Sequence, residues 1–146
     1  MLIGKYKYAV DSRNRIFIPA KFRADIGEKC VVSKDIVYNA LNIYPIKEWN
    51  EFTAKIEALP TIQMRDIREM IYSSSDEAEP DLQGRIILSQ QLCEDVGILN
   101  TKEVIIVGVH THAQIWSISE WEAFNVNIKS KENKEALVAE LLKIGF

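Results

Sequence analysis

Short apolar runs bounded by turn-forming residues predict the strands of this chain. Arg-Ile-Phe-Ile at 15–18 and Arg-Ile-Ile-Leu at 85–88 each follow a polar loop, a pattern typical of a strand that leaves a turn. Later apolar segments predict one β-hairpin in each half, at 29–33 with 41–44 and at 103–109 with 114–117. The pattern therefore predicts two β-rich halves.

Helix signals follow the strands at matching places in the two halves. Pro19 suits a first helical position and Ser89 suits an N-cap, while Gly27 and Gly97 are typical helix stops. The spacing Ser-x-x-Glu at 117–120 matches a capping box. We therefore expect a short helix after the first strand of each half and a second helix that closes the unit.

Two more helices are predicted outside these units. Pro60 ends one helix, and Thr61 can cap the next, which has a moderate apolar stripe. In the tail, apolar residues recur at helical spacing at Leu137, Val138, Leu141 and Leu142. This face could cover the protomer or a neighbouring subunit, and we expect the protomer, since terminal amphipathic helices usually cover their own core.

An internal repeat is the most informative feature of the sequence. Residues 11–27 align with residues 81–97 at a constant offset of 70 residues, and Glu-Trp-x-x-Phe at 48–52 recurs at 120–124. The matched pairs of the first segment include Asp11 with Asp81, Arg15 with Arg85, Ile16 with Ile86, and Gly27 with Gly97. The repeat divides the chain into a first repeat at 1–59, a connecting helix at 60–75, a second repeat at 76–125 and a helical tail at 126–146. The predicted fold class is mixed α+β with short peripheral helices.

Composition adds a basic N-terminal region to an acidic chain. The 146 residues carry a net charge of -3, with 47% hydrophobic and 27% charged residues, which are ordinary globular values. Residues 1–23 nevertheless hold six cations against one acid, so one face can be basic. No apolar stretch approaches a membrane span, the N-terminus lacks a signal-peptide pattern, and Cys30 and Cys93 suit small, partly buried thiols. We therefore expect a cytoplasmic protein.

The repeated Asp-x-x-x-Arg loops are the candidate functional site. Arg15 and Arg85 carry planar guanidinium groups that match phosphate oxygens or the edge of guanine. Asp11 and Asp81 suit turn formation and orientation of the arginines, and the loops also contain Asn14 and Gly84, which tolerate positive φ. Additional phosphate contacts are expected from Arg13, Lys5, Lys7, Lys21 and Arg23. Alternatively, the arginines only pair with the aspartates and cover one end of the core.

These motifs resemble the MraZ family of AbrB-like, swapped-hairpin DNA-binding proteins. The resemblance rests on GKYKYAVDSRNRIFIPAKFR at 4–23, YPIKEW at 44–49 and DLQGRIIL at 81–88, with Asn14, Ser89 and Lys5 as departures from the usual pattern. It implies a β-barrel-like core of two pseudo-symmetric halves and a homo-oligomeric ring. It also implies a nucleoid-associated repressor that binds repeated boxes in double-stranded DNA, in the promoter of the cell-division and cell-wall gene cluster. No cofactor, membrane or small-molecule substrate is implied.

Other classes explain the residues less well. A protease with two aspartates would need Asp-Ser/Thr-Gly triplets, which Asp11 and Asp81 do not begin, so we do not expect an enzyme. His110 and His112 could ligate a metal, but exposed hairpin-tip side chains are the favoured interpretation. The tryptophans, Trp49, Trp116 and Trp121, suit core or interface anchors. An oligomeric protein-interaction module or an AbrB-like antitoxin with incidental DNA contact remains the alternative function.

Overall fold

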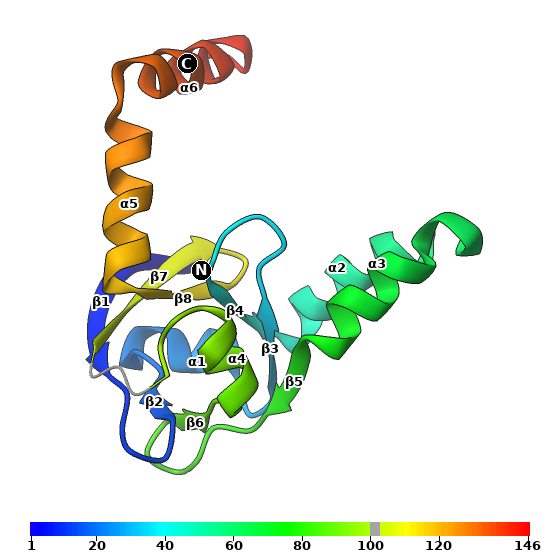
Figure 1. Cartoon of the computed structure of the whole chain (residues 1–146), viewed down its shortest axis with the longest axis vertical. Coiled ribbons are helices and arrows are strands. Elements are labelled where there is room, and N and C mark those ends of the chain that lie inside the picture. Colours follow the sequence, from blue (N-terminus) through cyan, green and yellow to red (C-terminus); the bar gives the residue numbers. More distant parts are fainter. Residues whose placement is uncertain (100–102) are drawn as a thin grey trace.

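Eight strands in the described part of the chain form two antiparallel sheets. The structure is a computed structural model, and it describes residues 1–99 and 103–146 (Figure 1). The larger sheet has the order β1-β7-β8-β4-β3-β5, and the smaller sheet pairs β2 with β6. The strands are β1 Leu2–Ala9, β2 Arg15–Phe17, β3 Cys30–Lys34, β4 Leu41–Pro45, β5 Ser75–Ala78, β6 Arg85–Ile87, β7 Glu103–His110 and β8 Ala113–Ser117.

The predicted hairpins are present, but the sheet stays open. The β3–β4 and β7–β8 hairpins join through the β4–β8 pair, where Leu41 lies opposite Ile115. Among the described residues no closed barrel forms, because the outer strands β1 and β5 each pair on one side only. The mixed α+β class is therefore confirmed, whereas the barrel closure implied by the family resemblance is replaced by two sheets with a core between them.

Short helices follow the strands of the small sheet, and longer helices project from the large sheet (Figure 1). Ser89 and Ser117 cap α4 and α5 as predicted, accepting hydrogen bonds from the amides of Leu92 and Glu120 at 3.2 Å each. Pro19 precedes a 3-10 turn that runs into α1. The helices are η1 Ala20–Phe22, α1 Arg23–Ile26, α2 Ile46–Glu57, α3 Thr61–Ser73, α4 Gln90–Asp95, α5 Ile118–Lys129 and α6 Lys131–Lys143. None of the described helices has the length and hydropathy that crossing a bilayer requires.

The main core fills the space between the two sheets. Ile16 and Ile86 of the small sheet are fully buried and pack in one cluster with Phe22 and Leu92 of the short helical segments and Ile106 of β7. Burial of such aliphatic and aromatic side chains contributes about 1.5–3 kcal/mol each relative to exposure. The small sheet is therefore anchored to the large one by the inward side chains of the repeated segments.

Both cysteines lie in this core. Cys30 in β3 and Cys93 in α4 are free and fully buried. Burial raises the pKa of Cys30 to about 12 and also raises the pKa of Cys93. The prediction of small buried thiols is confirmed, and neither thiol is available as a nucleophile in the folded state.

The tryptophans anchor two smaller apolar clusters, as predicted. On the face of the large sheet opposite the main core, Trp116 packs against Trp121 and Phe124 of α5. Between α2 and α3, Trp49 packs beside Ile56 in a third cluster. The first of these clusters attaches α5 to the sheet, and Trp49 attaches α2 through its contact with Tyr44 of β4, with ring centres 5.6 Å apart.

The C-terminal helix does not cover the protein's own core, contrary to the expectation from its apolar spacing. No residue of α6 is buried, and Leu137 and Leu141 are 46% and 43% exposed. The helix follows α5 away from the sheets (Figure 1). The amphipathic pattern predicted the helix correctly but not its surroundings, because the pattern shows only that one face is apolar.

Candidate nucleic-acid interface

The two Asp-x-x-x-Arg loops have the same side-chain hydrogen bonds. In the first loop, one carboxylate oxygen of Asp11 accepts from the backbone amides of Arg13 at 2.9 Å and Arg15 at 2.8 Å, and the other accepts from Arg15 Nε at 2.6 Å. Asp81 in the second loop accepts from the amides of Gln83 and Arg85 at 2.9 Å each and from Arg85 Nε at 2.8 Å. Each aspartate therefore forms the turn and orients its arginine, as the sequence predicts.

The backbone of the loops also repeats. The amide of Asp11 donates to the carbonyl of Arg15 at 3.0 Å, and that of Asp81 donates to the carbonyl of Arg85 at 2.8 Å. The fourth loop residue has positive φ in both copies, 57° at Asn14 and 79° at Gly84. Asparagine is one of the few residues with a side chain that adopt this conformation readily, so Asn14 forms the same turn as Gly84 does in the second loop.

Both aspartates are held ionised. The pKa of Asp11 is lowered, first by the hydrogen bond from the Arg15 amide and further by the Arg15 side chain and the Arg13 amide. The pKa of Asp81 is lowered in the same way by Arg85 and the Gln83 amide. A carboxylate that stays ionised does not serve as a general acid at neutral pH, which agrees with a turn-forming function.

The small sheet relates the two loops to each other. Ile16 lies opposite Ile86 in the β2–β6 ladder. Beyond the ladder, the amide of Ile18 donates to the carbonyl of Gly84, and the amide of Leu88 donates to the carbonyl of Asn14, both at 2.8 Å. The two bonds are reciprocal, because each joins the residue after one strand to the fourth residue of the other loop. The two loops therefore lie at opposite ends of one short ladder.

The outer face of this ladder carries the two arginines. Ile16 and Ile86 point into the core, so alternation along β2 and β6 directs Arg15 and Arg85 outward. Arg15 lies opposite Ile87, which places Arg85 diagonally across the ladder at about 7–8 Å between Cα atoms. The Arg85 guanidinium carbon lies 5.8 Å from the centre of the Phe17 ring.

Each arginine keeps part of its donor set free. The Arg15 and Arg85 side chains are 26% and 22% exposed, and both ion pairs use Nε. Within residues 1–99 and 103–146, the terminal NH₂ groups of these two arginines make no hydrogen bond. A guanidinium held through Nε can present its two terminal nitrogens to a pair of acceptors, such as phosphate oxygens or guanine O6 and N7.

Three of the other predicted cations lie on the segments that flank the small sheet. Arg13 is exposed in the first loop, and Lys21 is exposed in η1. Arg23 Nε donates to the carbonyl of Ile18 at 3.1 Å, and its side chain lies against Gly84, so that a Cβ at this glycine would overlap it. Arg23 from the first half thus lies beside the loop of the second half.

The structure does not bring Lys5 and Lys7 to the loops. These residues lie opposite Val107 and Ile105 in the β1–β7 ladder, on the sheet face that α5 covers. The ammonium nitrogen of Lys5 is 6.0 Å from the centre of the Trp121 ring. The small sheet packs on the opposite face, so the two lysines belong to a different surface from the arginine pair.

The two histidines differ from each other. His110 is exposed with a φ of 76°, as expected for a hairpin tip. His112 is half-buried, stacks on Tyr44 with ring centres 4.6 Å apart, and shares a hydrogen bond of 2.9 Å with Thr111. Burial lowers the pKa of His112. The interpretation as an exposed loop side chain is therefore wrong for His112, whose ring completes an aromatic cluster.

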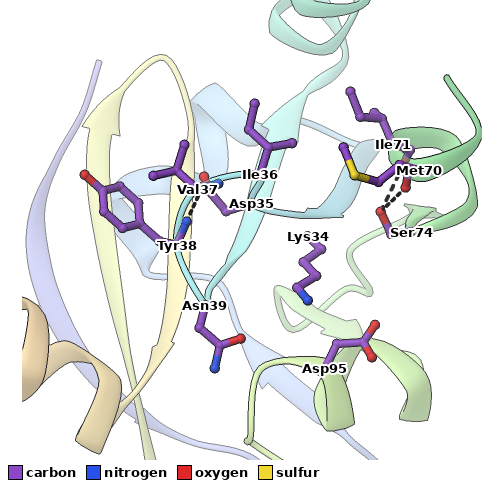
Figure 2. Close-up of a pocket in the computed structure, with 10 residues that line it drawn as sticks. All are labelled: Lys34, Asp35, Ile36, Val37, Tyr38, Asn39, Met70, Ile71, Ser74 and Asp95. Atoms are coloured by element: carbon purple, nitrogen blue, oxygen red, sulfur yellow. Dashed lines mark hydrogen bonds between the residues drawn. The ribbon is translucent and has the colours of Figure 1, made fainter. Parts of the chain in front are cut away.

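A separate pocket of about 490 Å³ lies between the β3–β4 loop and α3 (Figure 2). Of its two acidic side chains, Asp35 accepts from the amides of Val37 and Tyr38 at 2.8 Å each, and Asp95 accepts from the side-chain amide of Gln91 at 2.9 Å. Its serine, Ser74, donates to the carbonyl of Met70 at 2.7 Å. Asp35 and Ser74 therefore hold the loop and the end of the helix.

Three apolar residues on the loop side of the small sheet were missed in the sequence analysis. Phe17 is 39% exposed and Ile87 is 70% exposed on the outer face of the ladder, and Leu82 is fully exposed at the tip of the second loop. The alternation of Arg15, Ile16 and Phe17 is the signal that could have revealed the first of them, because residues two apart in a strand share a face.

The fold and the site together define a small α+β protein with an internal sequence repeat, which presents two equivalently held arginines on one face. A family model described as "MraZ protein, putative antitoxin-like" matches residues 1–68 and 71–143. The "Transcriptional regulator MraZ" of Acetivibrio thermocellus is 35% identical over 145 residues, covering 94% of this chain and 99% of that protein.

Two further relatives have the same name. The protein of Clostridium acetobutylicum is 33% identical over 148 residues and covers both chains completely. That of Caldicellulosiruptor bescii is 40% identical over 132 residues, covering 88% of this chain and 90% of its own. The chain belongs to the MraZ family. Its relatives are named as transcriptional regulators and not as enzymes, which agrees with the sequence prediction.

Proposed function

We propose that this chain is a sequence-specific DNA-binding transcriptional regulator, acting as a repressor, and that both Asp-x-x-x-Arg loops contact duplex DNA. One observation carries the proposal: equivalent aspartate contacts hold Arg15 and Arg85 on one face of the small sheet, and no residue in 1–99 or 103–146 hydrogen-bonds to their terminal NH₂ groups. The names of the relatives support the same class of function.

The remaining cations divide between two surfaces. Arg13, Lys21 and Arg23 flank the arginine pair and suit phosphate contacts around it. Lys5 and Lys7 lie on the other sheet face, so in a single protomer they do not extend this interface. The proposed DNA face therefore has Arg15 and Arg85 at its centre and a rim of phosphate-binding cations.

Assembly into a homo-oligomeric ring would make this small interface effective. A few cationic contacts per protomer give weak, salt-sensitive binding, whereas several linked protomers on repeated promoter boxes raise the effective concentration of each later contact. The family resemblance supports a ring that acts in the cytoplasm at the nucleoid, on the cell-division and cell-wall gene cluster. The exposed apolar face of α6 supports contact between subunits.

A double variant tests the proposal directly. Fluorescence anisotropy would compare wild type with Arg15→Ala/Arg85→Ala on duplex DNA from upstream of the protein's own gene, at two salt concentrations. We expect a loss of about 1–3 kcal/mol per arginine and a shallower salt dependence. Arg65→Ala is the matched control, because Arg65 is 80% exposed on α3, away from the loops. Unchanged binding by the double variant would reject the assigned interface.

The second candidate function is a protein-interaction module, related to the antitoxin-like description of the family. The exposed apolar residues of α6 favour it. An interface of this kind would be insensitive to salt and to the arginine pair, since hydrophobic contacts are not screened by ions. The salt titration therefore separates the two functions, and DNA binding that fails at both salt concentrations would favour the second.

A further inference from the structure

The two loops combine one backbone with two surface chemistries. Both aspartates accept the same three hydrogen bonds, so the second loop residue projects from an equivalent position in each copy. That residue is Ser12 in the first loop and Leu82 in the second, and the third residue is Arg13 or Gln83. The first tip is therefore polar and cationic, whereas the second is neutral and carries one apolar side chain, Leu82.

Leu82 serves no packing purpose in the described chain. Its relative exposure is 107%, compared with 1% for Ile86 in the strand that follows. A single exposed leucine is common on protein surfaces, so the exposure alone carries little weight. The position of Leu82 is stronger evidence. Leu82 lies in the same loop as Arg85, whose guanidinium lies over the Phe17 ring.

The apolar tip restricts what Leu82 can contact on DNA. Phosphate and sugar oxygens gain nothing from a leucine, which would remove water from them without replacing its hydrogen bonds. In the major groove, thymine alone among the four bases presents a methyl group, and apolar side chains recognise it by contact. The base edge is therefore the complementary surface for Leu82, next to an arginine suited to guanine.

We propose that Leu82 contacts the 5-methyl group of a thymine in the major groove and thereby fixes the orientation of each protomer on its DNA site. The proposal rests on the proposed function, because it requires the second loop to face DNA. Ser12 cannot make the equivalent contact, so the two ends of the bound site are unequal. The repeat thus supplies two similar anchors, and their tip residues distinguish the ends.

Replacing thymine by deoxyuridine tests the contact without changing base pairing. Each thymine in turn would be replaced in the upstream duplex, and anisotropy would compare wild type with Leu82→Ser, which copies the first loop. We expect one thymine in each box whose methyl loss weakens wild-type binding about three- to fivefold, the equivalent of roughly one buried methyl group. Leu82→Ser should weaken binding to the unmodified duplex by at least this factor, because it changes every bound protomer, and it should be indifferent to deoxyuridine at that position.

Two controls separate the possible failures. Val126→Ser removes an exposed apolar side chain from α5 and should leave the deoxyuridine response as in wild type. Binding that depends on Arg15 and Arg85 but shows no methyl-sensitive thymine, or one that stays sensitive in Leu82→Ser, overturns the Leu82 contact and leaves the proposed function standing. Absence of binding by wild type to the upstream duplex overturns both.

Discussion

Ile16 and Ile86 lie directly opposite each other in the ladder between β2 and β6, and each is 1% exposed. They occupy equivalent positions of the sequence repeat, so the two copies of the repeat are paired with each other at these residues. The arginines one residue before them point to the opposite face of the ladder. The core contact of the two isoleucines therefore determines where Arg15 and Arg85 lie relative to each other.

Truncation of either isoleucine should destabilise the protein strongly. Ile86→Ala leaves a cavity in the main core and should lower the free energy of unfolding by about 2–5 kcal/mol, measured by urea denaturation. Ile87→Ala is the matched control, since Ile87 is adjacent but 70% exposed, and should change stability by about 0.5 kcal/mol or less. Equal effects of the two substitutions would show that the small sheet is not anchored through Ile86.

Gly84 and Arg23 should be coupled in stability. A Cβ at Gly84 would overlap the Arg23 side chain, whose Nε bonds the carbonyl of Ile18. Gly84→Ala should therefore cost more in wild type than in an Arg23→Ala background. Unfolding free energies of the four proteins give the interaction energy, which we expect to be about 0.5–3 kcal/mol. An interaction energy near zero would mean that only the positive φ of 79° opposes the alanine.

The sequence alone predicted the parts of the site that depend on local chemistry. Each Asp-x-x-x-Arg loop closes on itself within five residues, so the turn, the residue with positive φ and the aspartate–arginine contact could be predicted from spacing. The capping serines belong to the same group, because their partners are three residues away. Such features need no knowledge of the rest of the fold.

Features that depend on distant segments could not be predicted. Alternation along β1 separates Lys5 and Lys7 from Leu2, but it does not show which face the small sheet occupies. The sequence places His112 at the end of a hairpin, which suggests an exposed side chain. In the structure Tyr44, from the other hairpin, stacks on its ring. In each case the surroundings of the side chain are formed by residues far away in the sequence. The pattern of a single sequence does not show which distant segments contact each other.

The stability of the protein should fall on acidification through the pKa of His112. Burial lowers this pKa from 6.5, partly offset by Asp35, so the unfolded chain binds the proton first as pH falls. The stability that the neutral ring contributes is therefore present above about pH 6.5 and is lost as pH decreases through the folded-state pKa.

The variant His112→Phe keeps a ring against Tyr44 and removes the titration. Its unfolding free energy should change less between about pH 7 and about pH 5 than that of wild type, as measured by urea denaturation at each pH. His110→Asn is the control, because the site is exposed and asparagine accepts its positive φ. If His112→Phe retained the full acid loss of stability, other groups would have to account for it.

Both cysteines should be unreactive in the folded protein. Burial raises the pKa of Cys30 to about 12, so its thiol stays protonated at neutral and mildly alkaline pH. Ellman's reagent at about pH 8 should therefore label neither cysteine before denaturation and both after it, since Cys93 is buried as well. Rapid labelling of native protein would contradict the core position of the thiols.

The raised pKa of Cys30 also predicts how the stability of the protein changes at alkaline pH. The unfolded thiol of Cys30 ionises near 9.0, whereas the folded one does so near 12, so its contribution to stability is complete below about pH 9 and is lost as pH rises toward 12. Tyr44, whose pKa burial raises to about 12, adds to the loss in this range. Cys30→Ala should reduce the slope of stability against pH there, and an unchanged slope would assign the loss to the other groups whose pKa is raised, Tyr44 and Cys93 among them.

Removal of α6 should separate folding of the protomer from assembly. No residue of this helix is buried, so truncation after Ser130 should change the unfolding free energy of the isolated protomer by no more than about 0.5 kcal/mol. If the apolar face of α6 lies between subunits, truncation should reduce the oligomer size measured by light scattering. Any stability lost should then depend on protein concentration, because subunit contacts stabilise by mass action. A concentration-independent loss of several kcal/mol would instead place α6 against its own protomer.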